Sequence, residues 1–237
     1  MLIGISGKAQ SGKDTVGKII QNLFTGENWE IKKFADKVKT ICSILTGIPV
    51  TELEKESVKN SYLPEEWGEE FLATPESVEW GIRSMTVRQM LQKIGTDCMR
   101  NNLHYNTWVN AIFVDYKQYV FYEAELLAGA SILNSNWIIT DVRFPNEVHA
   151  IKQRGGKIIR IQRNRYRCQN CSSLVVGRFN CQNCGTDQLI DEPYSNHESE
   201  TALDKYRNWD HIIYNNGTLE ELTEKVTYIF NKFNNEN

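Results

Sequence analysis

The sequence predicts an α/β fold, in which a parallel sheet carries helices on both of its faces. Short apolar runs alternate with segments of helical periodicity along most of the 237 residues. Such alternation is typical of parallel strands joined by crossover helices. The first apolar run, Leu2–Ser6, leads into a glycine-rich loop and then a helix. Hydrophobic residues make up 41% of the chain, enough for a packed core. We therefore expect one domain over residues 1–237.

The expected strands are buried apolar runs of four to six residues. They are Leu2–Ser6, Trp29–Phe34, Trp137–Thr140, Lys157–Ile161 and His211–Tyr214. The expected helices are Asp14–Phe24, Asp36–Leu45, a helix opened by Thr86, Thr107–Leu127, Asn146–Arg154, and a last helix capped by Thr218 and Glu221. Helical spacing places Leu23, Cys98, Tyr119, Val120 and Leu219, among others, on the inward faces.

Two segments interrupt this alternation. Residues 50–85 are polar, contain Pro64 and Pro75, and predict a surface flap with no share in the core. Residues 163–196 form an insertion after the fourth strand. We expect both segments to be additions to the single domain.

Charge and hydropathy narrow the class of protein. The formal net charge is −3, from 27 basic and 30 acidic residues, which disfavours a protein that coats nucleic acid. No apolar run approaches 18 residues, and the N-terminus lacks a basic segment before an apolar one. We expect no membrane association, no nucleic-acid partner and a cytoplasmic location.

The loop after the first strand, residues 7–15, reads G-K-A-Q-S-G-K-D-T. A strand, a G-x-x-x-x-G-K loop and a helix in succession predict a phosphate-binding loop and a P-loop NTPase fold. Glycines at 7 and 12 allow the backbone to aim several N–H groups at one anion, and Lys13 neutralises the outer phosphates. The predicted nucleotide contacts are Gly7, Ala9, Ser11, Gly12, Lys13, Asp14 and Thr15.

The residue after the lysine departs from the usual pattern. The common motif places Ser or Thr there as a ligand of Mg²⁺, whereas this chain has Asp14 followed by Thr15. Either residue is a candidate for the metal contact, directly or through water, and the sequence leaves the choice open.

The insertion carries two C-x-x-C pairs, Cys168–Cys171 and Cys181–Cys184, separated by nine residues. Two such turns can present four thiolates as a tetrahedron, which predicts a structural Zn²⁺ site and no catalytic zinc. The spacer holds Leu174–Phe179, enough for a tight hairpin. A redox dithiol or iron is the alternative. The lone Cys42 and Cys98 are interpreted as buried core thiols.

Several segments together resemble the deoxynucleoside monophosphate kinases of tailed bacteriophages and prophages, relatives of adenylate kinase. They are Gly12–Thr15, Phe34–Lys39, Trp137–Glu147 (W-I-I-T-D-V-R-F-P-N-E), His197–Leu203 and Asn216–Thr218. The resemblance implies ATP as donor, Mg²⁺ as cofactor, a deoxynucleoside monophosphate as acceptor, and a sheet of order 2-3-1-4-5. If the protein is phage-encoded, its compartment is the host cytoplasm.

In that strand order, Asp141 ends the strand beside the phosphate loop and faces the magnesium-bound phosphates. Arg143 can reach the same crevice, or instead form a surface ion pair with Glu147. Phosphoryl transfer needs several cations to neutralise two sets of phosphates. Arg160, Arg163, Arg165 and Arg167 lie within eight residues at the start of the insertion. We expect Lys13, Asp141, Arg143, Arg163 and Arg165 to act in catalysis.

The acceptor is expected to meet the second helix and the helix from Thr86. Arg88 and Arg100 are candidates for its monophosphate, and Asp36, Lys37, Gln89 and Gln92 for its nucleoside. The resemblance places Asn216 and Gly217 against the donor adenine. It also makes the insertion a lid over ATP, as in adenylate kinases. Two alternative functions stay open. One is another small-molecule kinase, and the other is a zinc-ribbon ATP-binding protein that contacts nucleic acid. A homodimer stays open.

Overall fold

The computed structural model describes residues 1–26, 28–72, 80–126, 136–191 and 197–235. By internal contacts the chain divides into two compact units. The first comprises Met1–Lys33 and Ile112–Asn237, and the second comprises Phe34–Ala111. Each unit is described by itself. No helix in the described part of the chain is both long and apolar enough to cross a membrane.

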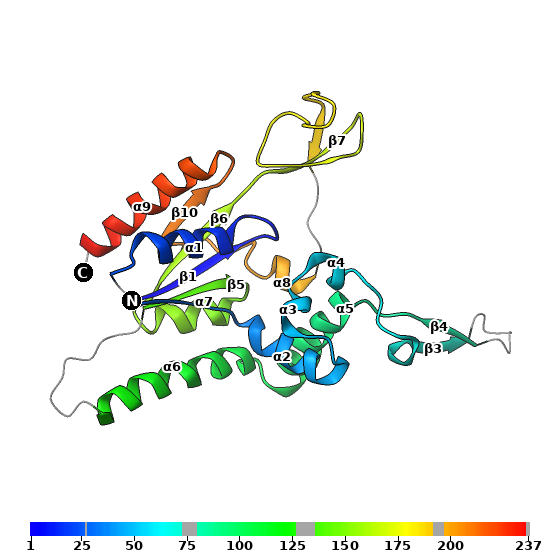
Figure 1. Ribbon diagram of the computed structural model, residues 1–237, viewed down its shortest axis with the longest axis horizontal. Helices are drawn as coiled ribbons and strands as arrows, with labels where there is room; N and C mark the ends of the chain where they lie inside the picture. The colour runs from blue at the N-terminus through cyan, green and yellow to red at the C-terminus, as the bar shows by residue number, and fades with distance from the viewer. Residues whose placement is uncertain (27, 73–79, 127–135, 192–196, 236–237) are drawn as a thin grey trace. The chain divides into compact units, whose positions relative to one another are not determined.

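The first unit contains a five-stranded sheet in which every pair is parallel. In spatial order its strands are β2 (Trp29–Lys32), β5 (Asn136–Val142), β1 (Leu2–Gly7), β6 (Lys157–Gln162) and β10 (His211–Tyr214) (Figure 1). Numbered along the chain within this sheet, that order is the predicted 2-3-1-4-5. All five predicted strands are present. The second is shorter than expected because it ends at Lys32.

Helices cover both faces of this sheet. On one face, α1 (Lys13–Leu23) and α9 (Leu219–Asn235) pack against each other and bury an apolar core of aliphatic and aromatic side chains. On the other face lies α7 (Pro145–Lys152), whose Ile151 contacts the backbone of β1 at Gly4 (Figure 1). Leu23 and Leu219, predicted to face inward, are instead exposed. Each is the terminal residue of its helix, where the amphipathic stripe has no partner left to cover it.

The second unit is mostly helical. It contains α2 (Ala35–Thr46), α3 (Val50–Leu53), α4 (Glu56–Lys59), a 3₁₀ turn (Glu65–Trp67), the antiparallel pair β3 (Glu69–Leu72) and β4 (Trp80–Arg83), α5 (Val87–Gln92), a π-helix (Lys93–Leu103) and the start of α6 (Thr107–Leu126). The expectation that residues 50–85 take no part in a core was wrong, because Leu53 and Leu63 are buried. Pro75 lies outside the described residues.

Two helix predictions in this unit have different outcomes. Thr86 caps α5 with the predicted capping box, in which Gln89 donates its backbone N–H to the Thr86 hydroxyl and its side chain accepts from the Thr86 N–H. Cys42 is buried as predicted, but Cys98 is exposed. Cys98 lies in the π-helix, whose wider turn rotates side chains off the α-helical phase on which the prediction rested.

Helix α6 matches the predicted segment closely. Trp108 and Ile112 are buried as expected, and Trp108 donates its indole N–H to the Gly95 carbonyl at 2.6 Å. The side chains of Tyr119 and Val120, also predicted to face inward, lie outside the described part of the structure.

The insertion folds as a small three-stranded sheet of order β8-β7-β9, with β7 (Arg165–Cys168), β8 (Leu174–Val176) and β9 (Leu189–Asp191). The hairpin predicted within the spacer is wrong. The spacer strand β8 pairs backward with β7, and Gly177 extends this ladder by donating its N–H to the Asn164 carbonyl at 2.8 Å. The short helix α8 (Glu198–Thr201) follows, and residues 192–196 lie outside the described part.

Candidate functional site

The glycine loop connects the carboxyl end of β1 to the start of α1. Gly12 adopts φ +99°, in the left-handed region that favours glycine, and forms the N-cap of α1. A Cβ atom on Gly7 would lie 2.4 Å from the Ser11 hydroxyl and 2.7 Å from the Ile161 carbonyl. The two glycines are therefore required for different reasons. Gly12 adopts a left-handed backbone conformation, and Gly7 allows the Ser11 hydroxyl and the Ile161 carbonyl to approach its backbone closely.

Lys13 is the buried cation of this loop, with 9% of its surface exposed. Its Nζ donates to the carbonyls of Gly7 at 2.8 Å and Lys8 at 2.7 Å. Burial, together with the nearby positive charge of Arg143, lowers the pKa of Lys13 to about 8. The ammonium group is thus held inside the loop at the cost of its hydration, a cost that a bound anion would offset.

Asp14 and Thr15 diverge in their contacts. The Asp14 carboxylate accepts from the Thr140 hydroxyl at 2.7 Å and pairs with Lys33 at 3.1 Å. Burial raises the pKa of Asp14, but these two partners outweigh it and hold the pKa below its usual value. Thr15 is exposed. The carboxylate after the lysine is therefore engaged by the strand beside the loop, through the Thr140 hydroxyl.

Asp141 and Arg143 lie at the carboxyl end of β5, next to β1 in the sheet. Asp141 is buried, and its charge acts on both Lys13 and Arg143. Burial lowers the pKa of Arg143, but the carboxylates of Glu200 and Asp141 raise it more. A carboxylate and two cations thus share the edge of the sheet where parallel folds bind ligands.

Arg143 does not make its ion pair with Glu147, one of the two roles considered for it. Glu147 is buried and accepts from the backbone N–H groups of Arg143 at 2.7 Å and Phe144 at 3.1 Å, at the start of α7. The Arg143 guanidinium instead pairs with Glu200 and donates to the Ser199 carbonyl at 3.3 Å.

Glu200 is a site residue that the sequence reasoning missed. Its second carboxylate oxygen accepts from the Ala9 N–H at 3.1 Å, and its backbone carbonyl accepts from Lys8. Burial raises the pKa of Glu200, but Arg143 lowers it more, so the net shift is downward. The segment His197–Leu203 was noted in the sequence only because it resembles the deoxynucleoside monophosphate kinases. That resemblance implied no role for the Glu200 carboxylate.

The turn after β10 holds Asn215, Asn216 and Gly217. Asn215, also missed, is buried and donates its side-chain amide to the Ser11 carbonyl at 2.9 Å. The Asn216 side chain accepts from the Asn164 N–H at 2.8 Å. A Cβ on Gly217 would lie 1.9 Å from the Glu221 carboxylate, so any other residue there would displace that side chain.

The four arginines at positions 160, 163, 165 and 167 make different contacts. Arg160 is buried, donates to the Ser6 hydroxyl at 3.0 Å and lies over the Trp209 ring. The Arg163 guanidinium lies against Gly177. Arg165 is half-buried in β7, while Arg167 is exposed and donates to the Ser172 carbonyl at 2.9 Å.

The six residues predicted for the acceptor all lie in the second unit. Asp36 pairs with Lys39 at 3.5 Å, and Arg88 pairs with Glu56 at 2.6 Å and contacts Asn60. Gln89 belongs to the capping box of α5. Arg100 is buried in the π-helix and donates to the Tyr105 carbonyl at 3.4 Å, while Lys37 and Gln92 are half-buried.

The four cysteines of the insertion converge. The sulfur of Cys168 lies 3.5 Å from that of Cys184, the sulfur of Cys171 lies 3.4 Å from that of Cys181, and all four lie within 4.8 Å of one another. Four thiolates around Zn²⁺ at 2.3 Å stand about 3.8 Å apart, so the donor set fits this metal. Hydrogen bonds to Ser173, whose hydroxyl lies 3.2 Å from the Cys171 sulfur, and to Asn183 and Cys181 lower the pKa of the Cys171 thiol to about 5, whereas burial raises the pKa of Cys168 to about 11.

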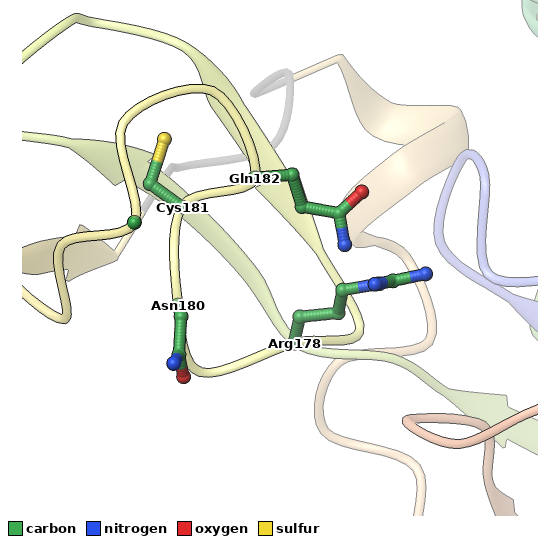
Figure 2. Close-up of a pocket in the computed structure, with 5 residues that line it drawn as sticks. Arg178, Asn180, Cys181 and Gln182 are labelled. Carbon is green, nitrogen blue, oxygen red and sulfur yellow. The ribbon is translucent and has the colours of Figure 1, made fainter.

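A shallow hollow of about 480 Å³ borders this cluster. It is lined by Arg178, Asn180, Cys181, Gln182 and Gly185. Figure 2 shows the Arg178 and Gln182 side chains next to each other and the Cys181 sulfur turned away from them. The sulfur therefore faces the cysteine cluster and not the hollow.

A loop that gathers N–H groups and a buried lysine at this sheet edge, beside Asp141 and Arg143, is suited to binding the phosphates of a nucleotide. Comparison with known proteins narrows the class. Residues 51–173, just over half of the chain, match the family model "Deoxynucleotide monophosphate kinase", and the chain belongs to that family.

One relative extends the likeness to nearly the whole chain. A protein of Acanthamoeba polyphaga mimivirus called "Putative deoxynucleotide monophosphate kinase" is 27% identical over 234 residues, 95% of this chain and 94% of the relative. The family match includes Asp141 and Arg143 but begins after the glycine loop and ends between the two C-x-x-C pairs. Together the comparisons support a nucleotide kinase role, which is that of a phosphotransferase.

Proposed function

We propose that this protein transfers the γ-phosphate of ATP to a deoxynucleoside monophosphate, with Mg²⁺, giving the diphosphate and ADP on a P-loop NTPase fold. The observation that carries the proposal is Lys13. A lysine buried to 9% exposure and held by two loop carbonyls is poised to exchange those partners for phosphate oxygens. Family membership supports the acceptor class.

The proposed chemistry consists of positioning and charge neutralisation. The loop from Gly7 to Thr15 wraps the donor phosphates, with backbone N–H groups and Lys13 as donors. Arg143, at the end of β5, stabilises charge that develops on the transferring group. No protein nucleophile is needed, since the acceptor phosphate oxygen attacks directly.

The residues suited to Mg²⁺ are Asp141 and Thr15. Asp141 is a buried carboxylate at the strand end, and carboxylate and hydroxyl oxygens are ligands that Mg²⁺ prefers. Asp14 already accepts from Thr140 and Lys33, so we assign the loop contact to Thr15 and give Asp14 the role of bracing the loop. Mg²⁺ held by these residues would neutralise negative charge on the outer phosphates.

For the acceptor, we propose that Arg88 binds the monophosphate and exchanges its ion pair with Glu56 for phosphate oxygens. That pair is exposed and therefore cheap to replace. Asp36, Lys37, Gln89 and Gln92 remain the proposed nucleoside contacts. Arg100 also remains proposed, although its burial means that it can reach the acceptor only after a local change in the π-helix.

The insertion is proposed to be a zinc-braced lid that carries Arg163 and Arg165 toward the ATP phosphates. Among its described residues, the insertion has a local core of Val175 with Cys168 and Cys181, flanked by a few half-buried side chains. So small a core requires a metal or another brace. Asn216 and Gly217 are proposed to flank the donor base.

The test is an assay of ADP formation from ATP and Mg²⁺ with each common deoxynucleoside monophosphate in turn, and chromatography of the products. We expect ADP and the matching diphosphate in equal amounts with at least one acceptor. ATP hydrolysis that no acceptor stimulates would sink the proposal. Turnover of another phosphorylated small molecule alone would move the protein to a different acceptor class.

A further inference from the structure

The turn that follows β10 is fixed to the sheet and to the insertion at once. The Asn215 N–H donates to the Gln162 carbonyl at 2.8 Å, which continues the pairing of β10 with β6. The next residue, Asn216, accepts from the Asn164 N–H at 2.8 Å. The Asn164 carbonyl in turn accepts from the N–H of Gly177, also in the insertion, at 2.8 Å. The backbone around Asn215 therefore has little freedom, and its side chain has a defined place.

That side chain points into the phosphate loop. The Asn215 amide donates to the Ser11 carbonyl at 2.9 Å, and 204 residues of sequence separate the two. Asn215 is only 6% exposed, so this hydrogen bond is shielded from water. A shielded carbonyl that loses its only strong donor is costly, and the loop would then turn to find another.

The direction of the Ser11 carbonyl determines where a neighbouring N–H points. In a planar trans peptide, the carbonyl of one residue and the N–H of the next point in opposite directions. With the Ser11 carbonyl directed to Asn215, the Gly12 N–H is directed to the other side. In a loop that binds anions through N–H groups, the direction of this peptide is what must be fixed.

Gly12 shows how closely the two segments approach. A Cβ atom at Gly12 would lie 2.4 Å from the Asn215 Nδ2. The absence of a side chain at residue 12 therefore has a reason beyond its φ of +99°. It leaves room for Asn215 to reach the carbonyl just before it.

We propose that Asn215 is a positioning residue that holds the phosphate loop in its anion-binding conformation. This inference rests on the proposed use of the loop for nucleotide phosphates. Asn215 touches no substrate. It acts through the Ser11–Gly12 peptide, and its loss lowers affinity for the donor nucleotide while leaving the affinity for the acceptor unchanged.

The test is Asn215→Asp, which keeps the size of the side chain but replaces the donor with an oxygen facing the Ser11 carbonyl. Asn215→Ser is the second variant, because a serine carries no charge and is too short to reach that carbonyl. ADP affinity is measured by isothermal titration calorimetry. We expect about tenfold weaker binding for Asn215→Ser, the loss of one buried hydrogen bond, and a larger loss for Asn215→Asp.

Thr218→Asp is the matched control. Thr218 lies in the same turn and caps α9 by accepting from the Glu221 N–H at 3.3 Å. Aspartate also caps helices, so this variant adds a negative charge and keeps the fold. We expect its ADP affinity to stay within twofold of the wild type. An equal loss in Thr218→Asp and Asn215→Asp, with none in Asn215→Ser, would mean that charge and not the hydrogen bond matters, and would overturn the inference.

Kinetics separate a positioning role from a merely structural one. We expect the KM for ATP to rise about tenfold and the KM for the acceptor to change less than twofold, in variants that thermal denaturation without nucleotide shows to be folded at the assay temperature. ADP binding within twofold of the wild type in both Asn215 variants overturns the inference, even if the kinase activity is confirmed. Lost ADP binding in a protein that phosphorylates no deoxynucleotide keeps the inference and removes the proposed acceptor.

Discussion

The glycine loop and the cysteine ribbon, which is the three-stranded insertion with its four cysteines, both contain irregular backbone. The two segments stabilise that backbone by different means. In the glycine loop, carbonyls are engaged by the Lys13 ammonium and the Asn215 amide, from inside the same buried sheet edge. In the ribbon, four sulfurs lie within 4.8 Å of one another, and the small apolar core beside them consists of Val175 with Cys168 and Cys181. The first loop is therefore stabilised by the fold, whereas the second is proposed to depend on a metal that joins its two turns.

This contrast predicts where each loop fails. A substitution in the glycine loop should reduce ligand binding and leave the fold intact, because the surrounding core of α1, α9 and the sheet does not depend on it. A substitution at a cysteine should unfold the ribbon locally and leave the sheet intact. The predictions below test this difference, beginning with the largest expected effect.

The largest effect is expected for Lys13→Ala. The change removes the cation that we propose faces the donor phosphates, and we expect kcat to fall by about 10²–10³-fold or more. The free energy of unfolding should rise or stay the same, because a buried ammonium with a pKa lowered to about 8 is a cost to the folded state below that pH. Steady-state kinetics and urea denaturation at pH 7 measure the two effects. A kcat within tenfold of the wild type would contradict the role of Lys13.

Cys181→Ser should have the next largest effect. We expect the bound zinc to fall from about one equivalent to none, and the amide protons of β7, β8 and β9 to exchange rapidly, since structural zinc supplies folding energy to such modules. Strands β1, β5 and β6 should stay protected. Metal analysis and hydrogen exchange followed by mass spectrometry measure both.

Cys98→Ser is the control, because Cys98 is exposed and lies outside the cluster. It should keep the zinc and the exchange pattern. If Cys181→Ser loses zinc and retains the phosphoryl transfer rate, the ribbon is not a lid, and a role in contacting a partner is favoured instead.

The third prediction concerns Glu200→Gln, which retains the shape of the side chain but removes the charge that pairs with Arg143. The Glu200 side chain is 11% exposed and that of Arg143 is 31% exposed, so solvent partly screens the pair. We expect the free energy of unfolding to fall by about 1–3 kcal/mol. The folded pKa of Glu200 is lowered, so its stabilisation is present above the unfolded pKa of about 4.3 and is lost as the pH falls further.

The wild type should therefore lose more stability than Glu200→Gln as the pH falls below the unfolded pKa of about 4.3, and the two curves should converge in acid. Thermal denaturation across this range measures the difference. Parallel curves would show that the Glu200 charge contributes nothing to the folded state.

The sequence predicted those parts of the site that are formed by neighbours along the chain. The glycine loop, Lys13 and the C-x-x-C pairs are local patterns with fixed chemical requirements, and the capping box at Thr86 and Gln89 is another. Glu200 and Asn215 were missed because each reaches the loop across about 200 residues of sequence. Only the sheet order brings them there.

The errors on the fold have a similar cause. Cys98 was placed inside because helical spacing assumes a turn of 3.6 residues, and a π-helix breaks that phase. The spacer hairpin was placed within Leu174–Phe179 because local pairing is the simplest use of a short apolar run. In the structure the run pairs with β7, a strand that ends at the first cysteine, Cys168, and that spacing alone does not indicate.

The smallest effect is expected for Thr86→Ala, in the second unit. The change removes the hydroxyl that accepts from the Gln89 N–H at 3.2 Å, and a lost N-cap costs about 1 kcal/mol. The cost should appear as faster hydrogen exchange in α5 and not in α1, whose N-cap is Gly12 and uses no side chain. Arg88 lies in the first turn of α5, so we expect the KM for the acceptor to rise about two- to threefold while the KM for ATP stays constant. A change in the KM for ATP alone would place α5 on the donor side and contradict the assignment of Arg88 to the acceptor.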